Sequence, residues 1–411
     1  MSHCSSRVIS FTLLLFGLGG SVRAAEAEPP ITGKAVPRLQ QLDRRMLEFL
    51  REYNIPGASL AIAKEGRLVF ARGYGWADVQ NKRPVRPASR FNLASCSKPI
   101  TAAAVLKLVD EGKVRLDDKV FALLDDLKPP EGAKVDPRIR EITVRQMLHH
   151  AGGLVRGNGP LPDIARHLKI ELPLPLNRVI AFNLGKPLLF DPGTDQKYSN
   201  LGFLVLRLVV ERASGQAYEM FTAERVLKPM GIRNAHLDRM EGYWSNEVHR
   251  YPGGKVHPGG HGEIKDGAGC WVLSTVDAMR FVTSLDGSRG ARVLSQRAYR
   301  EMLAPLPSLG KKANERHNGL GWDVVERSRG GVLYSKNGGV AGIATWIEHL
   351  PNGVCWAVFF NGNLKDDDED KTPRKPARKK PWSVLRESIE KIDNWPAHDL
   401  FEPEPTGKSN P

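Results

Sequence analysis

Cysteine is scarce in this sequence, which has only 4 in 411 residues and no Cys-x-x-Cys pair. The first cysteine lies close to the N-terminus, and the other three stand among small or apolar neighbours: Cys4, Cys96, Cys270 and Cys355. Once the N-terminal segment is removed their number is odd, so the chain is not held together by a disulfide framework. The three remaining cysteines are typical of buried thiols.

A long apolar run is also missing, because the stretch from Val8 to Leu18 has only eleven residues, too few to span a bilayer. Arg7 precedes this stretch, and a small-residue site ending at Ala24 follows it. That order is typical of a cleavable signal peptide. The sequence therefore predicts a signal peptide over residues 1–24, export to the periplasm or secretion, and no stable membrane insertion.

Acidic residues are outnumbered, with 46 Asp and Glu against 60 Lys and Arg and a net charge of +14. The excess is scattered along the chain. The one dense basic run, residues 374–380, closely follows the acidic run 366–370, and no aromatic residue interleaves it as single-strand binding requires. We therefore expect no nucleic-acid partner, a charged flexible insertion over residues 364–380, and a flexible tail over 401–411.

The apolar pattern predicts two β-hairpins near the two ends of the chain, one from residues 58–63 and 68–74 and one from 343–349 and 354–360. Helical periodicity dominates between them and also appears before the first hairpin and after the second. The clearest helical segments are 36–53, 99–111, 143–149, 201–213, 217–226, 275–285 and 382–394.

This order favours an α/β (α+β) fold in which one antiparallel sheet is built from both halves of the chain and is flanked by helices. An all-helical region is then inserted between the two halves. We expect a single domain over residues 36–400, with a sheet part at about 36–115 and 265–400 and a helical part at about 116–264. A cleft between the two parts is the natural position for a functional site.

The strongest chemical signal is the segment Ser95-Cys96-Ser97-Lys98, directly ahead of a helical run. A lysine three residues after a serine lies one helical turn away on the same face, so the ammonium and the hydroxyl can touch. A serine hydroxyl becomes a good nucleophile only when a neighbour takes its proton, and a desolvated lysine can do that. Alone, this spacing is also explained by a serine at a helix start and a solvated lysine.

Two further elements follow in order, Tyr198-Ser199-Asn200 and Lys336-Asn337-Gly338-Gly339. The trio resembles the signature of the serine β-lactamase and penicillin-binding-protein family, closest to class C β-lactamases and related DD-peptidases and esterases. Further landmarks of the family stand in the right order at residues 55–57, 147–154, 190–200, 228–232 and 274–275. The resemblance covers about residues 39–361 and implies a β-lactamase/transpeptidase-like fold.

The resemblance also implies the roles of individual residues. Ser95 would be the acylated nucleophile and Lys98 its hydrogen-bonded partner. Tyr198 would be the general base, with a pKa lowered by the cations Lys98 and Lys336. Lys336 would also attract a substrate carboxylate. The remaining substrate-binding positions would be Asn200, Asn337, Gly338 and Gly339, with the backbone N–H groups of residues 95 and 339 forming an oxyanion hole.

These roles predict an exported serine hydrolase whose acyl donor is an ester, a D-amino-acid peptide or a β-lactam, without any cofactor. Asn337 replaces the threonine usual in the family, which puts efficient β-lactam hydrolysis in doubt. Oligomeric state is not readable from the sequence. The alternative is a non-catalytic, peptidoglycan-binding protein that keeps the cleft without turnover, and the intact trio argues against it.

Histidines suggest two other readings. His149 and His150 could belong to a Ser/His/Asp arrangement, but the chain has no Gly-x-Ser-x-Gly elbow. His249, His257 and His261 have a loose metal-ligand spacing, but glycine and proline between them preclude a helix and no His-Glu-x-x-His motif is present. The sequence therefore favours neither a histidine base nor a metal site.

Overall fold

The structure is a computed structural model that describes residues 28–157, 159–239, 241–260, 266–290, 292–310, 315–327, 330–364 and 380–401. The signal peptide expected over residues 1–24 lies outside the described residues. So do residues 365–379 of the expected insertion and all but the first residue of the expected tail.

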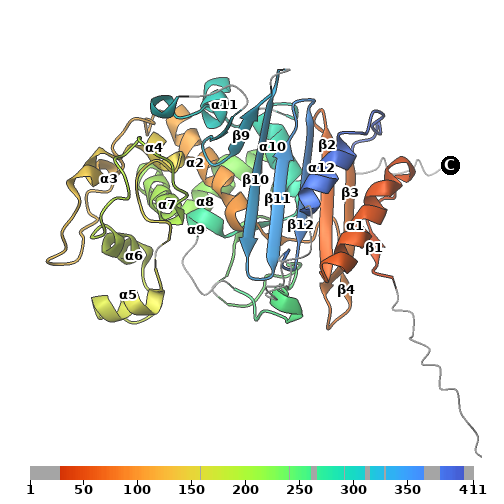
Figure 1. The fold of residues 1–411 in the computed structure, drawn as a ribbon, viewed down its shortest axis with the longest axis horizontal. Coiled ribbons are helices and arrows are strands. Elements are labelled where there is room, and N and C mark those ends of the chain that lie inside the picture. The colour runs from red at the N-terminus through yellow and green to blue at the C-terminus, as the bar shows by residue number, and fades with distance from the viewer. Residues whose placement is uncertain are drawn as a thin grey trace, which may run out of the picture.

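One antiparallel sheet dominates the molecule and is assembled from both ends of the chain (Figure 1). Its order is β1-β3-β2-β12-β11-β10-β9-β8, with β4 paired to β3. The two halves join where β2 pairs with β12, in a register that runs from Ala58 opposite Phe360 to Lys64 opposite Val354. The expected sheet built from two halves is therefore confirmed. The strands are β1 Ile31–Thr32, β2 Gly57–Lys64, β3 Arg67–Asp78, β4 Arg83–Pro84, β8 Arg316–Asn318, β9 Asp323–Glu326, β10 Val332–Val340, β11 Ile343–His349 and β12 Val354–Phe360.

Helices cover both faces of this sheet (Figure 1). On one face lie α1 (Gln40–Glu52) and α12 (Pro381–Ile389), which share an apolar cluster with β2, β3, β11 and β12. On the other face lie α2 (Lys98–Asp110), α10 (Thr275–Leu285) and α11 (Gln296–Leu303), in a larger cluster that continues into the helical region. The sheet is therefore covered on both faces, which explains why β12 is apolar throughout and why β2 is mostly apolar rather than alternating.

A buried carboxylate fixes α12 on the sheet. Glu348 is 0% exposed and accepts hydrogen bonds from the indole N–H groups of Trp346 (3.3 Å) and Trp356 (3.2 Å). Arg386 of α12 donates its Nε to the same carboxylate at 2.7 Å and also forms an ion pair with it. Trp382 of α12 stacks on Trp346 with ring centroids 5.1 Å apart. Burying a carboxylate is tolerated here because its partners surround it.

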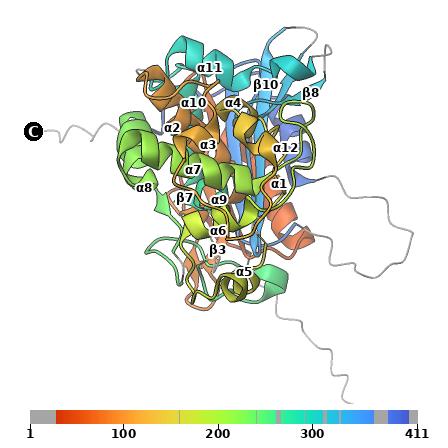
Figure 2. The same ribbon diagram turned by 90° about the vertical axis from the view of Figure 1, so that its left-hand side faces the viewer.

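The inserted region is mainly helical and lies beside the sheet in Figure 1, and its helices face the viewer in Figure 2. Its helices are α3 Val120–Leu123, α4 Val144–Leu148, α5 Leu161–Leu168, α6 Leu176–Asn183, α7 Asn200–Ser214 and α8 Tyr218–Thr222, the last continued by a π-helical turn Ala223–Leu227. Within the described residues, short 3-10 turns occur at Pro37–Leu39, Ala94–Ser97 (η2), Pro137–Glu141, Lys228–Met230, Pro252–Gly254 and Pro307–Leu309.

The expectation of an all-helical insertion needs one correction. Strand β6 (His236–Leu237) lies inside it and pairs with β7 (Trp271–Leu273), which also pairs with β5 (Phe91–Asn92). A two-residue strand is too short to show an alternating pattern in the sequence, which is why it was missed. The short helix α9 (Asp266–Gly269) leads into β7. Strand β5 of this small second sheet directly precedes the turn that carries Ser95.

Helix α2 is the central helix of the fold. Its stretch of small and apolar residues, 99–106, is buried at every position, and α2 packs against both α7 and α11. Helices that are apolar on all sides belong in the middle of a protein. The nucleophile turn is therefore anchored to the most deeply buried part of the core.

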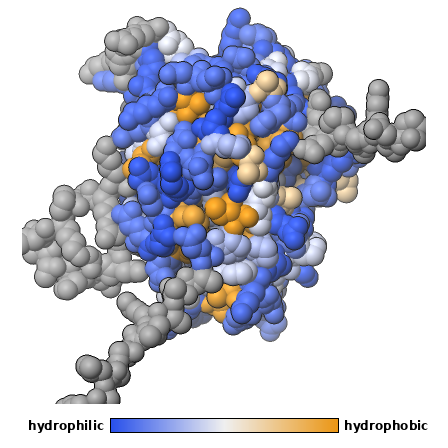
Figure 3. All heavy atoms as spheres, turned by 90° about the vertical axis from the view of Figure 1, so that its right-hand side faces the viewer, coloured by the Kyte–Doolittle hydropathy of each residue, from blue (hydrophilic) through white to orange (hydrophobic). Residues whose placement is uncertain are grey.

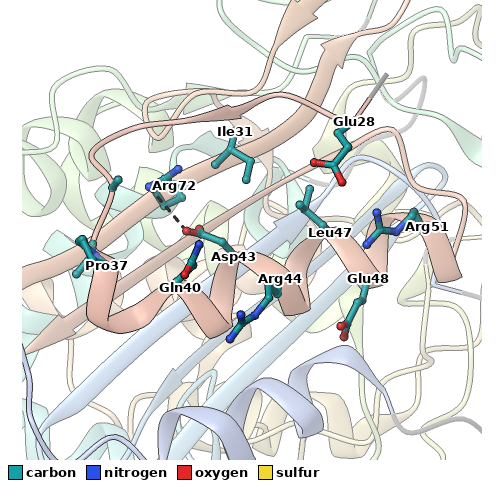
Figure 4. Close-up of a pocket in the computed structure, with 12 residues that line it drawn as sticks. Glu28, Ile31, Pro37, Gln40, Asp43, Arg44, Leu47, Glu48, Arg51 and Arg72 are labelled. Atoms are coloured by element: carbon teal, nitrogen blue, oxygen red, sulfur yellow. Dashed lines mark ion pairs between the residues drawn. The ribbon is translucent and has the colours of Figure 1, made fainter. Parts of the chain in front are cut away.

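The α1 side of the molecule carries a hollow but none of the expected site residues. A cavity of about 580 Å³ lies between α1, the segment before it and β3, with the ion pair of Arg72 and Asp43 (3.8 Å) on its wall (Figure 4). The surface on this side is mainly hydrophilic, with hydrophobic residues in small separate patches (Figure 3). Among the described residues, no helix has the length and apolar character needed to cross a membrane.

Candidate active site

Ser95 lies in the η2 turn between β5 and α2. The turn starts at Ala94, which has a left-handed backbone (φ 46°) and donates its N–H to Asn92 Oδ1 at 2.7 Å. Cys96 N–H then donates to Leu93 O at 3.0 Å. Alanine seldom adopts a positive φ, so surrounding contacts must hold this conformation. The result is a sharp turn that leaves Ser95 partly accessible while its neighbours are buried.

Lys98 is 0% exposed and its ammonium position is fixed by three contacts. Nζ lies 3.3 Å from Ser95 Oγ, 2.9 Å from Asn200 Oδ1 and 2.6 Å from the main-chain oxygen of Ala268. Burial, and next the nearby Lys336 cation, hold the pKa of Lys98 well below its ordinary value. A neutral amine has two N–H donors and one lone pair. The two carbonyl-type oxygens take the donors, so the lone pair is left for the hydroxyl of Ser95.

Tyr198 contacts the same serine from the other side, with its OH 2.5 Å from Ser95 Oγ. The Nζ atoms of Lys98 and Lys336 lie 4.7 Å and 5.5 Å from the centroid of its ring. The expected lowering of its pKa is nevertheless wrong. Burial raises the pKa of Tyr198 to about 12, which outweighs the opposing hydrogen bond from Ser95. Tyr198 is therefore a phenol at neutral pH and can donate a proton.

The segment around Tyr198 is positioned by the start of α7. Ser199 caps the helix by accepting the N–H of Gly202 at 3.0 Å, and it donates its own hydroxyl to Val155 O at 2.7 Å. Asn200 is the first residue of α7. A serine at the N-cap satisfies a free N–H of the first turn, so the central residue of the Tyr-Ser-Asn motif is structural. It orients Tyr198 and Asn200 toward Lys98 and Ser95.

Strand β10 closes the third side of the site. Gly338 lies so near the nucleophile turn that a Cβ there would stand 2.3 Å from Leu93 O and 3.0 Å from Ser95 N. Lys336 is 4% exposed, whereas the side chain of Asn337 and the backbone of Gly339 are on the accessible side of the strand. Only glycine permits this approach, which brings β10 against the backbone N–H of the nucleophile.

Cys96 points away from the nucleophile and ties the turn to the sheet. Its Sγ donates to Lys336 O at 3.2 Å and accepts from Thr345 Oγ1 at 3.4 Å. Thr345 Oγ1 also contacts Leu93 O at 2.8 Å. Burial raises the pKa of the Cys96 thiol to about 12, which makes it a poor nucleophile. The second position of the Ser-x-x-Lys motif thus provides a packing contact between η2 and β10.

Within the part of the chain that the structure describes, neither His149 nor His150 forms a hydrogen bond with Ser95. His150 accepts the N–H of Ser199 at its Nδ1 (3.2 Å), and its ring packs against Tyr198 with centroids 4.6 Å apart. Burial, and next the Lys336 cation, keep the pKa of His150 well below its ordinary value. His149 contacts Asn318 O at 2.8 Å. Both are therefore neutral packing residues, and His150 supports Tyr198.

Two charged residues of the site carry no sequence signal of their own. Asp323 of β9 lies beside β10, with Oδ2 3.7 Å from Lys336 Nζ. Arg156 lies at the rim, with its guanidinium carbon 5.5 Å from the centroid of the Tyr198 ring. Neither belongs to one of the three motifs, so only the folded chain reveals them.

Possible metal ligands come together in another part of the sheet. Ligand atoms of Asp286, His349 and Cys355 all lie within 4.8 Å of one another, at the ends of α10 and β11 and the start of β12. His249, which the sequence placed in a loose metal-like pattern, instead lies 3.6 Å from Asp78. His261 of that pattern is outside the described residues. No group of this kind adjoins Ser95 among the residues that the structure describes.

The chain resembles several known proteins. Protein flp of Staphylococcus aureus (strain MW2) is 29% identical over 195 residues, which is 47% of this chain and 37% of that protein. Esterase EstB of Burkholderia gladioli is 33% identical over 218 residues, 51% of this chain and 53% of that protein. The matched part thus spans about half or less of these curated relatives. Among solved structures, EstCE1, described as a hydrolase with promiscuous acyltransferase activity, has a TM-score of 0.66 at 21% identity, covering 79% of this chain and 94% of that one.

The family itself is shown by a model that covers most of the chain. The model described as Beta-lactamase matches residues 42–378, which include all three motifs and both halves of the sheet. With the β-lactamase/transpeptidase fold and the convergence of Ser95, Lys98 and Tyr198 already established, the protein belongs to the beta-lactamase family of serine hydrolases.

Proposed function

We propose that the protein is an exported serine hydrolase that forms an acyl-enzyme on Ser95 and transfers the acyl group to water. One observation carries the proposal: the hydroxyl of Ser95 lies within reach of two groups of complementary character. The Nζ atom of the buried Lys98 lies 3.3 Å from Ser95 Oγ and offers a lone pair. The OH of Tyr198 lies 2.5 Å from the same oxygen and offers a phenolic proton. A packing or binding role requires neither arrangement.

In acylation, Ser95 Oγ attacks the carbonyl carbon of the acyl donor while its proton passes to Lys98 Nζ. The carbonyl π electrons move to the oxygen and form a tetrahedral oxyanion. When this intermediate collapses, the bond to the leaving group breaks and the phenol of Tyr198 gives its proton to the departing atom. The Lys98 ammonium then returns a proton to the phenolate, so both groups regain their starting states.

The oxyanion is stabilised by the backbone N–H groups of Ser95 and Gly339. The close packing of β10 on the nucleophile turn supports this, because a Cβ added to Gly338 would stand only 3.0 Å from the main-chain nitrogen of Ser95. Removing one such donor typically costs about 3–4 kcal/mol of transition-state stabilisation. In deacylation, water takes the place of the leaving group and the same proton transfers run in reverse.

Esters are the acyl donors that the site favours, ahead of D-amino-acid peptides and β-lactams. Asn337 is exposed on β10 at the position where the family usually has threonine, so the hydroxyl that would contact the carboxylate of a β-lactam is missing. Lys98 already engages Asn200 Oδ1, and the amide NH₂ of Asn200 is left to bind a substrate carbonyl. The name of EstB, an esterase, supports the same order.

Export rests on the N-terminal pattern of Arg7, the apolar stretch up to Leu18 and the small residues ending at Ala24. We propose cleavage after Ala24, followed by release into the periplasm or the medium. Fractionation of expressing cells and N-terminal sequencing of the released protein test this. A cytoplasmic protein that still carries residues 1–24 would refute it.

The acyl-enzyme is tested by covalent labelling. A fluorescent penicillin or a fluorophosphonate probe should label the wild type and not Ser95→Ala. Ser97→Ala is the matched control, because its hydroxyl accepts the N–H of Trp271 at 3.0 Å and faces away from the site. Labelling of Ser95→Ala at the wild-type level would overturn the assignment.

A substrate panel separates turnover from binding. We expect hydrolysis of p-nitrophenyl esters to exceed that of nitrocefin and of D-Ala-D-Ala peptides. A wild-type protein that is inert toward all three but is retained on peptidoglycan would instead establish the cell-wall-binding alternative.

A further inference from the structure

Lys336 of β10 is less available to a substrate carboxylate than the resemblance to the family implies. Lys336 is 4% exposed, and Asp323 Oδ2 lies 3.7 Å from its Nζ. The same oxygen of Asp323 also forms an ion pair with Arg316 at 3.0 Å, and the side chain of Arg316 is 62% exposed. A protein carboxylate thus stands beside the ammonium. An incoming substrate carboxylate would be repelled by Asp323 as well as attracted by Lys336.

Arg156 is a second cation of the site and differs from Lys336 in both exposure and carboxylate contacts. It is exposed, and among the described residues no carboxylate forms an ion pair with it. Its guanidinium carbon lies 5.5 Å from the centroid of the Tyr198 ring, and its main-chain oxygen accepts the N–H of Asn200 at 2.7 Å. The backbone contact ties Arg156 to the start of α7, so its side chain stays at the rim, one ring away from the nucleophile.

We propose that Arg156 is a carboxylate-binding residue of this enzyme and that its substrates include acyl donors that carry a negative charge a few atoms from the scissile carbonyl. This inference rests on the proposed function of Ser95. A guanidinium presents two parallel N–H donors to a carboxylate, which a lysine cannot do. Asp323 works in the opposite direction, because it weakens the attraction of Lys336 for the same group.

A matched pair of esters tests the inference. p-Nitrophenyl hydrogen glutarate and p-nitrophenyl valerate have acyl chains of equal length and differ in a terminal carboxylate or methyl. Arg156→Gln should lower the glutarate-to-valerate ratio of kcat/KM about 2- to 5-fold, the effect of one exposed ion pair. Arg166→Gln is the control for loss of one exposed arginine, since Arg166 is paired with Asp163 on α5. It should leave the ratio unchanged.

Asp323→Asn provides a test of opposite sign. Removing this carboxylate should raise the same ratio, because Lys336 then attracts the glutarate without competition. Both shifts should shrink as salt is added. A ratio that Arg156→Gln does not alter would overturn the inference while leaving the acyl-enzyme intact. Absence of turnover of both esters by the wild type would instead refute the proposed function.

Discussion

The charge state of Lys98 can be read from the pH dependence of folding, independently of any substrate. In the folded protein the amine is buried and its pKa lies well below 10.5, so it is neutral at pH values where the unfolded chain carries an ammonium. Folding then releases a proton. Stability must therefore rise with pH from the folded-state pKa up to 10.5 and fall as pH is lowered through the same range.

Lys98→Met removes this linkage and keeps the volume of the side chain. The difference in unfolding free energy, wild type minus variant, should increase by about 1.4 kcal/mol per pH unit within that range. A constant term is added to it, because the variant leaves Asn200 Oδ1 and Ala268 O without their donor, at about 1–3 kcal/mol for each buried oxygen. The slope, and not the offset, reports the ionisation.

Urea unfolding of both proteins between pH 6 and 9 measures the slope, and esterase assays on the same samples should show that the variant has lost about 10²- to 10⁴-fold in kcat. Lys107→Met on the same helix is the matched control, because Lys107 is only half-buried and contacts Val293 O. A wild-type-minus-variant difference that is flat with pH would mean that Lys98 stays protonated in the folded protein, and the base assigned to Ser95 would be wrong.

Three other changes have definite outcomes. Tyr198→Phe keeps the ring but loses the OH that lies 2.5 Å from Ser95 Oγ. Its kcat should fall about 10²- to 10⁴-fold, and its near-UV CD spectrum should not change. A variant with the wild-type kcat would contradict the role of Tyr198 as the acid. Gly338→Ala should lower both the thermal unfolding midpoint and kcat, because the added Cβ would stand 2.3 Å from a main-chain oxygen. Gly339→Ala, whose Cβ has no contact closer than 3.9 Å, should keep the wild-type midpoint. Equal midpoints for the two variants would refute the steric argument. Glu348→Gln breaks the buried network under α12 and should cost about 3–5 kcal/mol in urea unfolding, and a loss below about 1 kcal/mol would show that the network is dispensable.

The parts of the fold that the sequence predicted well are those with a regular local pattern. Helix α10 has the expected bounds, and the second hairpin appears as β11 and β12 over the expected residues. The sheet built from both halves of the chain followed from the order of the two hairpins and the helical segments, and in the structure the halves join where β2 pairs with β12. Ser95, Lys98, Tyr198 and Lys336 stood out because of spacing and order, and the fold brings them together.

The features that were missed depend on three-dimensional surroundings. Strand β10 carries Ser-Lys-Asn-Gly-Gly, a composition typical of a turn, and it is a strand only because β9 and β11 pair with it. The pKa of Tyr198 could not be inferred from the cations in its motif partners, because burial of the phenol outweighs them. Asp323 and Arg156 belong to no motif, and nothing local marks them as neighbours of Lys336 and Tyr198.

The contact between the nucleophile turn and the sheet has a consequence for how activity arises. Thr345 Oγ1 reaches Leu93 O across 252 positions of the chain, so the reacting hydroxyl and the strand that faces it are made by opposite ends of the polypeptide. Closing so long a loop is slow compared with forming local helices. During refolding, the far-UV circular dichroism of the helices should therefore return early. Hydrolytic activity should return only when the sheet strands from the two halves of the chain have docked on the nucleophile turn.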